Sequence, residues 1–167
     1  MGGPSHTAGP DEAGVGQLVS TVASVIRPII GNDWSEWKGL WEGYLRFYRR
    51  ELAEETSRFT FARLCQQSEG MFGFVAASDG PLTGFAHALV HPSTWSSNGY
   101  CYLEDLFVNP PARGGGVGRA LIEAVVGEGR HRNVDRVYWH TEEQNERARS
   151  LYDQLAHPTS FIVYEYP

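Results

Sequence analysis

The stretch that decides the fold is Tyr100–Ala120, with the sequence YCYLEDLFVNPPARGGGVGRA. Residues 100–108 are mainly apolar and aromatic and predict a strand, and Asn-Pro-Pro at 109–111 ends it because proline cannot donate to a sheet ladder. A glycine-rich loop follows at 113–118, and apolar spacing predicts a helix from about 117 to 130. A strand, a glycine loop and a helix therefore follow one another without interruption.

This loop has the composition of an anion site. Its glycines let the backbone approach a ligand closely, and the first turn of a helix exposes unpaired N–H groups at its positive end. The combination suits a phosphate or pyrophosphate, and Arg113 and Arg119 add positive charge. The P-loop does not fit because no lysine follows the glycines, and the dinucleotide fingerprint fails at Arg119 or Leu121, where it needs glycine or alanine.

Working outward, the remaining periodicities predict a mixed sheet with helices on both faces, an α/β (α+β) class. A flexible N-terminal arm is expected over 1–20, followed by a single domain over 21–167. Trp34, Trp37 and Trp41 belong to an amphipathic stripe that we expect to be mostly core. The predicted elements are strands at 22–30, 72–77, 82–90, 134–141 and 161–166, and helices from residue 33, at about 52–66 and at 145–155.

Charge and cysteine content narrow the class of function. The 167 residues include 14 basic and 20 acidic side chains, a formal net charge of −6, which argues against nucleic-acid binding. Residues 113–136 alone carry a local +2, so the other residues sum to −8 and favour a cationic partner. Cys65 and Cys101 have no metal-like spacing, and we expect reduced thiols, a cytoplasmic location and no metal. No apolar run is long enough to predict a membrane span.

The pattern Arg113-x-x-Gly116-x-Gly118 resembles the [Q/R]xxGxG/A signature of the GNAT superfamily of acetyl-CoA-dependent N-acetyltransferases. The resemblance covers about residues 23–166. The aromatic first helix and HPSTW at 91–95 are similar to the branch that acetylates histones, polyamines and amino acids. It implies the GNAT fold, a mostly antiparallel sheet of six to seven strands splayed in the middle, with acetyl-CoA as cosubstrate.

The resemblance also implies roles for individual residues. The edge formed by Leu106, Phe107 and Val108 would pair with the pantetheine arm of the cofactor. Asn145 would contact that arm, although it could simply cap its helix. Tyr152 would be the general acid, although its spacing also suits a core tyrosine. The residues expected to hold the pyrophosphate are Arg113, Gly114, Gly115, Gly116, Val117, Gly118 and Arg119.

A primary amine with a pKa near ~10 is mostly protonated at neutral pH, so a base must accept its proton. Glu104 on the central strand is the first candidate, and Glu142 and Glu143 are alternatives. Because Glu104 and Asp105 are neighbours, one of the two must face a wet cavity or be paired. Direct transfer in a ternary complex is expected, since neither cysteine has an activating environment. His87 and the other strand histidines are expected to be structural.

The leading hypothesis is an N-acetyltransferase that acts on a small cationic amine, an amino acid or a basic peptide. A non-catalytic CoA-binding regulatory module and a purely structural oligomerisation domain are the alternatives. A homodimer is predicted, because relatives in the family pair through C-terminal strands and Phe161–Tyr166 is apolar and aromatic. One departure from the family's usual pattern is Ser160-Phe161, where a Gly-Phe pair is typical.

Overall fold

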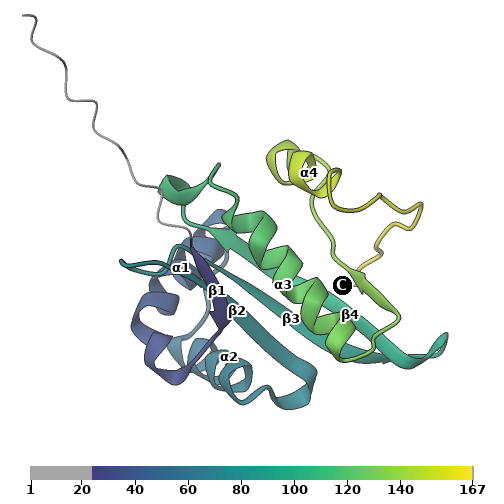
Figure 1. Ribbon diagram of the computed structural model, residues 1–167, viewed down its shortest axis with the longest axis horizontal. Coiled ribbons are helices and arrows are strands. Elements are labelled where there is room, and N and C mark those ends of the chain that lie inside the picture. The colour runs from purple at the N-terminus through teal and green to yellow at the C-terminus, as the bar shows by residue number, and fades with distance from the viewer. Residues whose placement is uncertain (1–23, 167) are drawn as a thin grey trace, which may run out of the picture.

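Helices enclose both faces of one mixed sheet in the computed structural model, which describes residues 24–166 (Figure 1). The arm predicted for 1–20 lies outside the described residues. Helices α1 (Trp34–Phe47) and α2 (Glu54–Gln66) cover one face, and α3 (Val117–His131) crosses the other. The short helix α4 (Glu146–Tyr152) packs its apolar residues on the α3 side. The predicted mixed class is confirmed.

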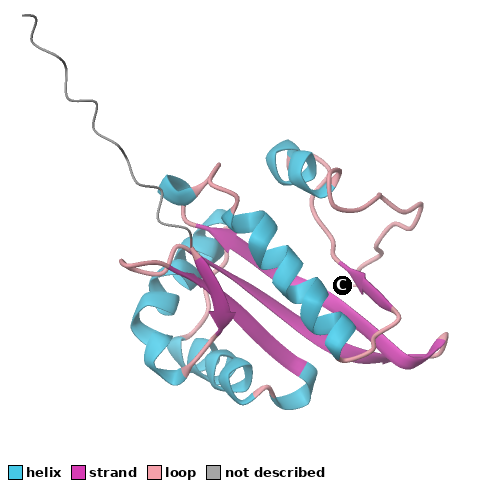
Figure 2. Ribbon diagram, in the orientation of Figure 1, coloured by secondary structure: helices cyan, strands magenta, loops and turns pink. Residues whose placement is uncertain are grey.

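The sheet has five strands in the order β1-β2-β3-β4-β5 (Figure 2). All neighbouring pairs are antiparallel except β4 and β5, which are parallel. The prediction of six to seven strands was therefore too high: among residues 24–166 no strand follows β5. Residues 161–166 have no sheet edge beside them to satisfy their backbone groups, and their large side chains are exposed. The strands are β1 (Val25–Pro28), β2 (Met71–Ala77), β3 (Gly84–Ser93), β4 (Ser96–Val108) and β5 (Arg136–Tyr138).

Two amphipathic helices build the two halves of the core. In α1 most of the predicted stripe is core: Trp37 and Trp41, together with Leu40, are buried against the sheet, while Trp34 is partly buried beside them. In α3 the buried positions recur at helical spacing and face the opposite side of the sheet. The sheet between them is thus held rigidly along β3 and β4, the strands that carry the site.

A β-bulge at Glu104 changes which face of the sheet β4 presents. The register pairs His87 with Asp105 but Ala88 with Leu103, so Glu104 is the extra residue. Because side chains alternate along a strand, this insertion reverses the faces beyond it. Leu103 accordingly packs on the α3 side, whereas Phe107 packs on the α1 side.

The sheet opens beyond the bulge. β5 pairs with β4 only at residues 100–102 and ends at Tyr138. The segment 103–108 of β4 still pairs with β3 but has no strand on its other edge. The splay implied by the family resemblance is therefore present, and it exposes one edge of β4 directly beside the start of α3.

Candidate active site

The glycine loop delivers unpaired amides to the start of α3. Gly116 is the residue before the helix and has φ 83°, and Gly114 has φ 88°, both in the left-handed region that favours glycine. The amide of Ala120 makes the first bond of the helix, to the Gly116 carbonyl at 3.0 Å. Among the described residues, no partner is recorded for the amides of 114–119. A Cβ at Gly116 would meet nothing within 4 Å, so this turn faces open space.

These amides border a cavity of about 510 Å³ that also reaches the open edge of β4. The C-terminal part of α1 and one side of α4 complete its walls. Of the predicted site residues, Gly115 and Glu104 do not line this cavity. Those that do are Leu106, Phe107, Val108, Arg113, Gly114, Gly116, Val117, Gly118, Arg119, Asn145 and Tyr152.

The lining of this cavity is cationic. It contains Arg113, Arg119 and Arg147 and, among its described residues, no carboxylate. Burial and the neighbouring Arg147 lower the pKa of Arg113, whose Nε donates to the Val108 carbonyl at 2.8 Å. An anion would relieve the repulsion between these like charges and accept from the free amides. The residues present therefore fit a diphosphate. Arg147 was not among the predicted site residues, because α4 is distant from α3 in the sequence and only the folded chain places the two helices side by side.

Tyr152 is the last residue of α4 and lines the cavity. Its ring packs edge-on against Trp139, with the centroids 5.4 Å apart. Burial, with a smaller effect of Tyr48, raises the pKa of the Tyr152 hydroxyl to about 12. The phenol therefore keeps its proton at neutral pH and can donate it. Both sequence interpretations fit this position, because the ring is packed while the residue still lines the cavity.

Asn145 caps α4, as one of its two sequence interpretations expects. Its side-chain oxygen accepts from the Ala148 amide at 3.3 Å, while its Nδ2 donates to the Thr141 hydroxyl at 3.4 Å. The residue also lines the cavity. The cap fixes where α4 begins and so positions the wall that carries Arg147 and Tyr152.

The two neighbouring carboxylates of β4 have different surroundings. Glu104, at the bulge, is the more exposed of the two, and desolvation of its carboxyl group, followed by the Asp105 charge, raises its pKa. Asp105 is the paired one of the two: its Oδ2 lies 2.9 Å from His87 Nδ1. The sequence predicted that one of these two acids would be paired or face a solvated cavity. It did not identify Asp105 as the paired one, because its partner lies on another strand, β3. Glu142 and Glu143 are exposed in the loop after β5, and Glu142 contributes to a raised pKa of Tyr48, after burial.

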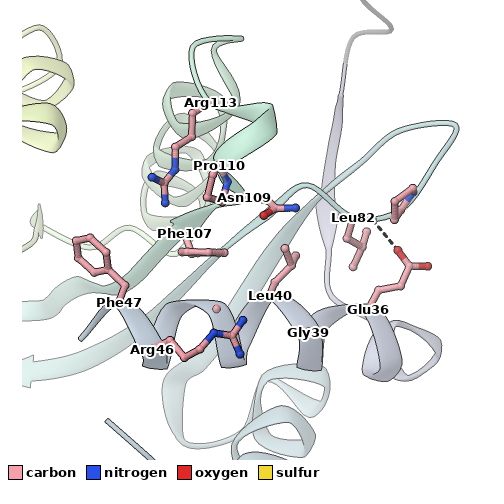
Figure 3. Close-up of a pocket in the computed structure, with 12 residues that line it drawn as sticks. Glu36, Gly39, Leu40, Arg46, Phe47, Leu82, Phe107, Asn109, Pro110 and Arg113 are labelled. Carbon is pink, nitrogen blue, oxygen red and sulfur yellow. Dashed lines mark hydrogen bonds between the residues drawn. The ribbon is translucent and has the colours of Figure 1, made fainter. Parts of the chain in front are cut away.

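A second hollow of about 630 Å³ lies on the α1 side of the same loop (Figure 3). Three residues line both spaces and form the boundary between them: Phe47, Phe107 and Arg113. Arg46 and Phe47 of α1 face this hollow, and Glu36 accepts from the Leu82 amide at 2.6 Å. That bond ties the β2–β3 turn to α1. It therefore supports the hollow structurally.

Within residues 24–166, no group of three histidine, cysteine, aspartate or glutamate side chains is placed to hold a metal ion. The helices in that range are also too short or too polar to cross a membrane.

Comparison with known proteins defines the class. Residues 37–156 match the Acetyltransferase (GNAT) family. The chain therefore belongs to this family and is an acetyl-CoA-dependent N-acetyltransferase. It is 34% identical over 143 residues to D-amino-acid N-acetyltransferase HPA3 of Saccharomyces cerevisiae, covering 84% of this chain and 89% of that protein. It is 31% identical over 142 residues to the uncharacterized N-acetyltransferase YhfO of Bacillus subtilis, covering 83% and 94%.

Solved structures agree with this fold. An aminoglycoside N-acetyltransferase, AAC(6')-Iy in complex with CoA, is similar with a TM-score of 0.77 at 21% identity, covering 90% of this chain and 98% of that chain. A ribosomal-protein-alanine N-acetyltransferase from Brucella melitensis biovar Abortus 2308 is similar with a TM-score of 0.74 at 22% identity, covering 87% and 99%. At these identities the likeness establishes the fold and leaves the acceptor open.

Proposed function

We propose that this protein transfers an acetyl group from acetyl-CoA to a primary amine by direct attack in a ternary complex. The observation that carries the proposal is one cavity that joins three features. These are the free amides at the start of α3, the unpaired edge of β4 and the Tyr152 hydroxyl. Each feature suits a different part of the same reaction.

The pyrophosphate end of acetyl-CoA is assigned to the glycine loop. The backbone amides of residues 114–119 donate hydrogen bonds to it. Positive charge comes from three side chains, those of Arg113, Arg119 and Arg147. Asn145 is placed against the cofactor arm while it caps α4.

The open edge of β4 is assigned to the pantetheine arm. Leu106, Phe107 and Val108 line the cavity at the point where β5 has left the sheet, so their edge can pair with an extended amide chain. When bound, the cosubstrate supplies a thioester carbonyl that an amine can attack. A β4 amide at Leu106 or Phe107 would stabilise the negative charge that develops on that carbonyl oxygen.

Proton transfer is assigned to two side chains. Glu104 accepts the proton that the acceptor amine must lose, and its raised pKa makes it a stronger base than an ordinary carboxylate. Tyr152 donates a proton to the departing thiolate, consistent with a phenol that stays protonated. Glu142 and Glu143 remain the alternative bases.

A cationic acceptor fits the α1 side of the bulge. Asp105 and Glu104 supply negative charge there, and Tyr48 and Tyr102 lie close enough for their pKa values to be raised by burial and by Asp105. Carboxylates beside aromatic rings favour an ammonium group. The acceptor class is a small cationic amine, an amino acid or a basic peptide, and a D-amino-acid acetyltransferase among the relatives supports inclusion of amino acids.

The test is a thiol-release assay with acetyl-CoA and a panel of D- and L-amino acids, polyamines, aminoglycosides and basic peptides. Amine-dependent release of CoA, with the acetylated product seen by mass spectrometry, is expected. Binding of acetyl-CoA by calorimetry without turnover on any amine would instead support a non-catalytic CoA-binding module. No binding at all would contradict both.

We also propose a homodimer in the cytoplasm. Large apolar side chains in Phe161–Tyr166 are 67% to 96% exposed, and β5 is an edge strand. A second copy could bury this segment and pair its backbone. Light scattering should give a dimer for the full chain and a monomer for a chain ending at residue 160. The cytoplasmic assignment is supported by the two free cysteines, Cys65 and Cys101.

A further inference from the structure

Two buried side chains from α1 and β3 and a partly buried one from β4 form a continuous chain of hydrogen bonds outside the cofactor cavity. Trp37 Nε1 donates to His87 Nε2 at 2.9 Å, and His87 Nδ1 lies 2.9 Å from Asp105 Oδ2. Trp37 is 0% exposed, the His87 side chain 2% and the Asp105 side chain 15%. The chain therefore runs from the interior to a carboxylate that reaches the surface of the bulge.

The chemistry of the donors fixes its direction. An indole nitrogen can only donate, so His87 Nε2 must accept and carries no proton. The ring proton then lies on Nδ1 and is donated to Asp105. His87 is stacked on Phe85, with centroids 4.3 Å apart and planes at 14°, so the ring is held in this orientation. A neutral histidine of one tautomer thus stabilises Asp105 as a carboxylate.

Asp105 faces titratable groups from two directions in addition to His87. Tyr44 and Tyr48 approach from α1 and the residue after it, and Tyr102 and Glu104 from β4 itself. Burial, followed by the Asp105 charge and a hydrogen bond to it, raises the pKa of Tyr44. The carboxylate is therefore surrounded by neutral phenols and one other acid.

We propose that Asp105 binds the ammonium group of the acceptor beside Glu104, and that Trp37 and His87 are positioning residues that hold the Asp105 carboxylate in place. The inference rests on the proposed function and deepens it by naming the residue that selects a cationic acceptor. In the reaction, one N–H bond of the ammonium breaks and its proton goes to the Glu104 carboxylate. The freed lone pair forms the new N–C bond at the thioester carbon as the carbonyl π pair moves to its oxygen. When that pair returns, the C–S bond breaks, Tyr152 protonates the departing thiolate, and the second proton of the nitrogen restores the Tyr152 hydroxyl. Asp105 takes no proton in this sequence.

The first test is the tautomer of His87, read by long-range ¹H–¹⁵N correlation spectra. The full chain should show His87 as the Nδ1–H tautomer at neutral pH. Trp37→Phe should change that signature, because Nε2 loses its donor. Trp41→Phe is the matched control: Trp41 is also buried in α1, but its indole donates to Ser57 at 3.1 Å. An Nε2–H or doubly protonated His87 in the full chain would overturn the inference.

The second test measures cation binding and needs no turnover. Phenethylammonium and its neutral analogue 2-phenylethanol are titrated into the full chain and into Asp105→Asn. The full chain should bind the cation at least tenfold more tightly than the alcohol, and Asp105→Asn should lose most of that preference. Equal binding of the two probes by the full chain would overturn the inference.

Kinetics separate this inference from the proposed function. In steady state, Asp105→Asn should raise the KM of the amine at least tenfold while the KM of acetyl-CoA stays within twofold. Normal amine KM in Asp105→Asn, with transfer intact, overturns the role of Asp105 and leaves the acetyltransferase standing. A chain that transfers to no amine, but keeps the cation preference and the His87 tautomer, overturns the proposed function and leaves the cation site standing.

Discussion

Replacing Gly116 and Gly127 separately by alanine applies one chemical change to two positions of the α3 segment. Gly116 precedes the helix with φ 83°, whereas Gly127 is an exposed interior position, and an added Cβ meets nothing within 4 Å at either site. Because the added methyl group contacts no other atom at either position, a steric clash cannot account for a difference between the two variants. An L-residue in the left-handed region costs about 1–2 kcal/mol, while alanine at a helix interior gains about 0.5–1 kcal/mol over glycine.

Gly116→Ala should therefore lower the free energy of unfolding by about 1–2 kcal/mol, and Gly127→Ala should raise it by about 0.5–1 kcal/mol. Each kcal/mol corresponds to roughly 2–4 °C in Tm for a domain of this size. Urea unfolding followed by circular dichroism gives the free energies, and calorimetry gives the acetyl-CoA affinity. We expect Gly116→Ala alone to weaken acetyl-CoA binding, by about tenfold, because the turn that aims the amides is strained. A stabilised Gly116→Ala with normal affinity would refute this reasoning.

Three further predictions use the other groups with altered environments. Tyr152→Phe should lower kcat by about a hundredfold or more and leave acetyl-CoA affinity unchanged; parallel loss of both in calorimetry and kinetics would make Tyr152 a packing residue. Burial raises the pKa of Cys101 to about 11, so a thiol reagent at pH 8 should label it slowly in the folded protein and quickly in urea; fast labelling before unfolding would contradict its burial. Burial acts to raise the pKa of Asp33, but bonds from Arg27 at 2.7 Å and the Ile30 amide at 2.9 Å outweigh it and lower the pKa. The contribution of Asp33 to the free energy of unfolding is thus fully present above its pKa in the unfolded chain, about 4, and is lost as the pH falls through its lower pKa in the folded protein. Asp33→Asn should cost about 1–3 kcal/mol at pH 7 and less at pH 3 in urea unfolding, and equal losses at both pH values would exclude the ion pair as the cause.

Local sequence patterns predicted the parts of the fold that depend on local chemistry. The apolar spacing of α1 and α3 and the glycine loop between β4 and α3 need only neighbouring residues, and all three form where expected. The cavity at the start of α3 follows from them, since strand end, loop and helix start adjoin by connectivity.

Long-range pairings could not be predicted in the same way. The bulge at Glu104 appears only when β4 is aligned with β3, and the Asp105–His87 and His87–Trp37 bonds join residues 18 and 50 positions apart. Residues 161–166 have the composition of a strand, yet a strand forms only beside another edge. The pattern of apolar and polar residues within 161–166 does not indicate whether a neighbouring strand is available to pair with them.

The most direct test of the account is a ¹H–¹⁵N titration of the full chain with CoA and, separately, with pantetheine, which lacks the pyrophosphate. The account predicts that amides 114–119 shift with CoA and stay unmoved with pantetheine, whereas amides 106–108 shift with both. Unmoved amides at 114–119 in the presence of bound CoA would contradict it.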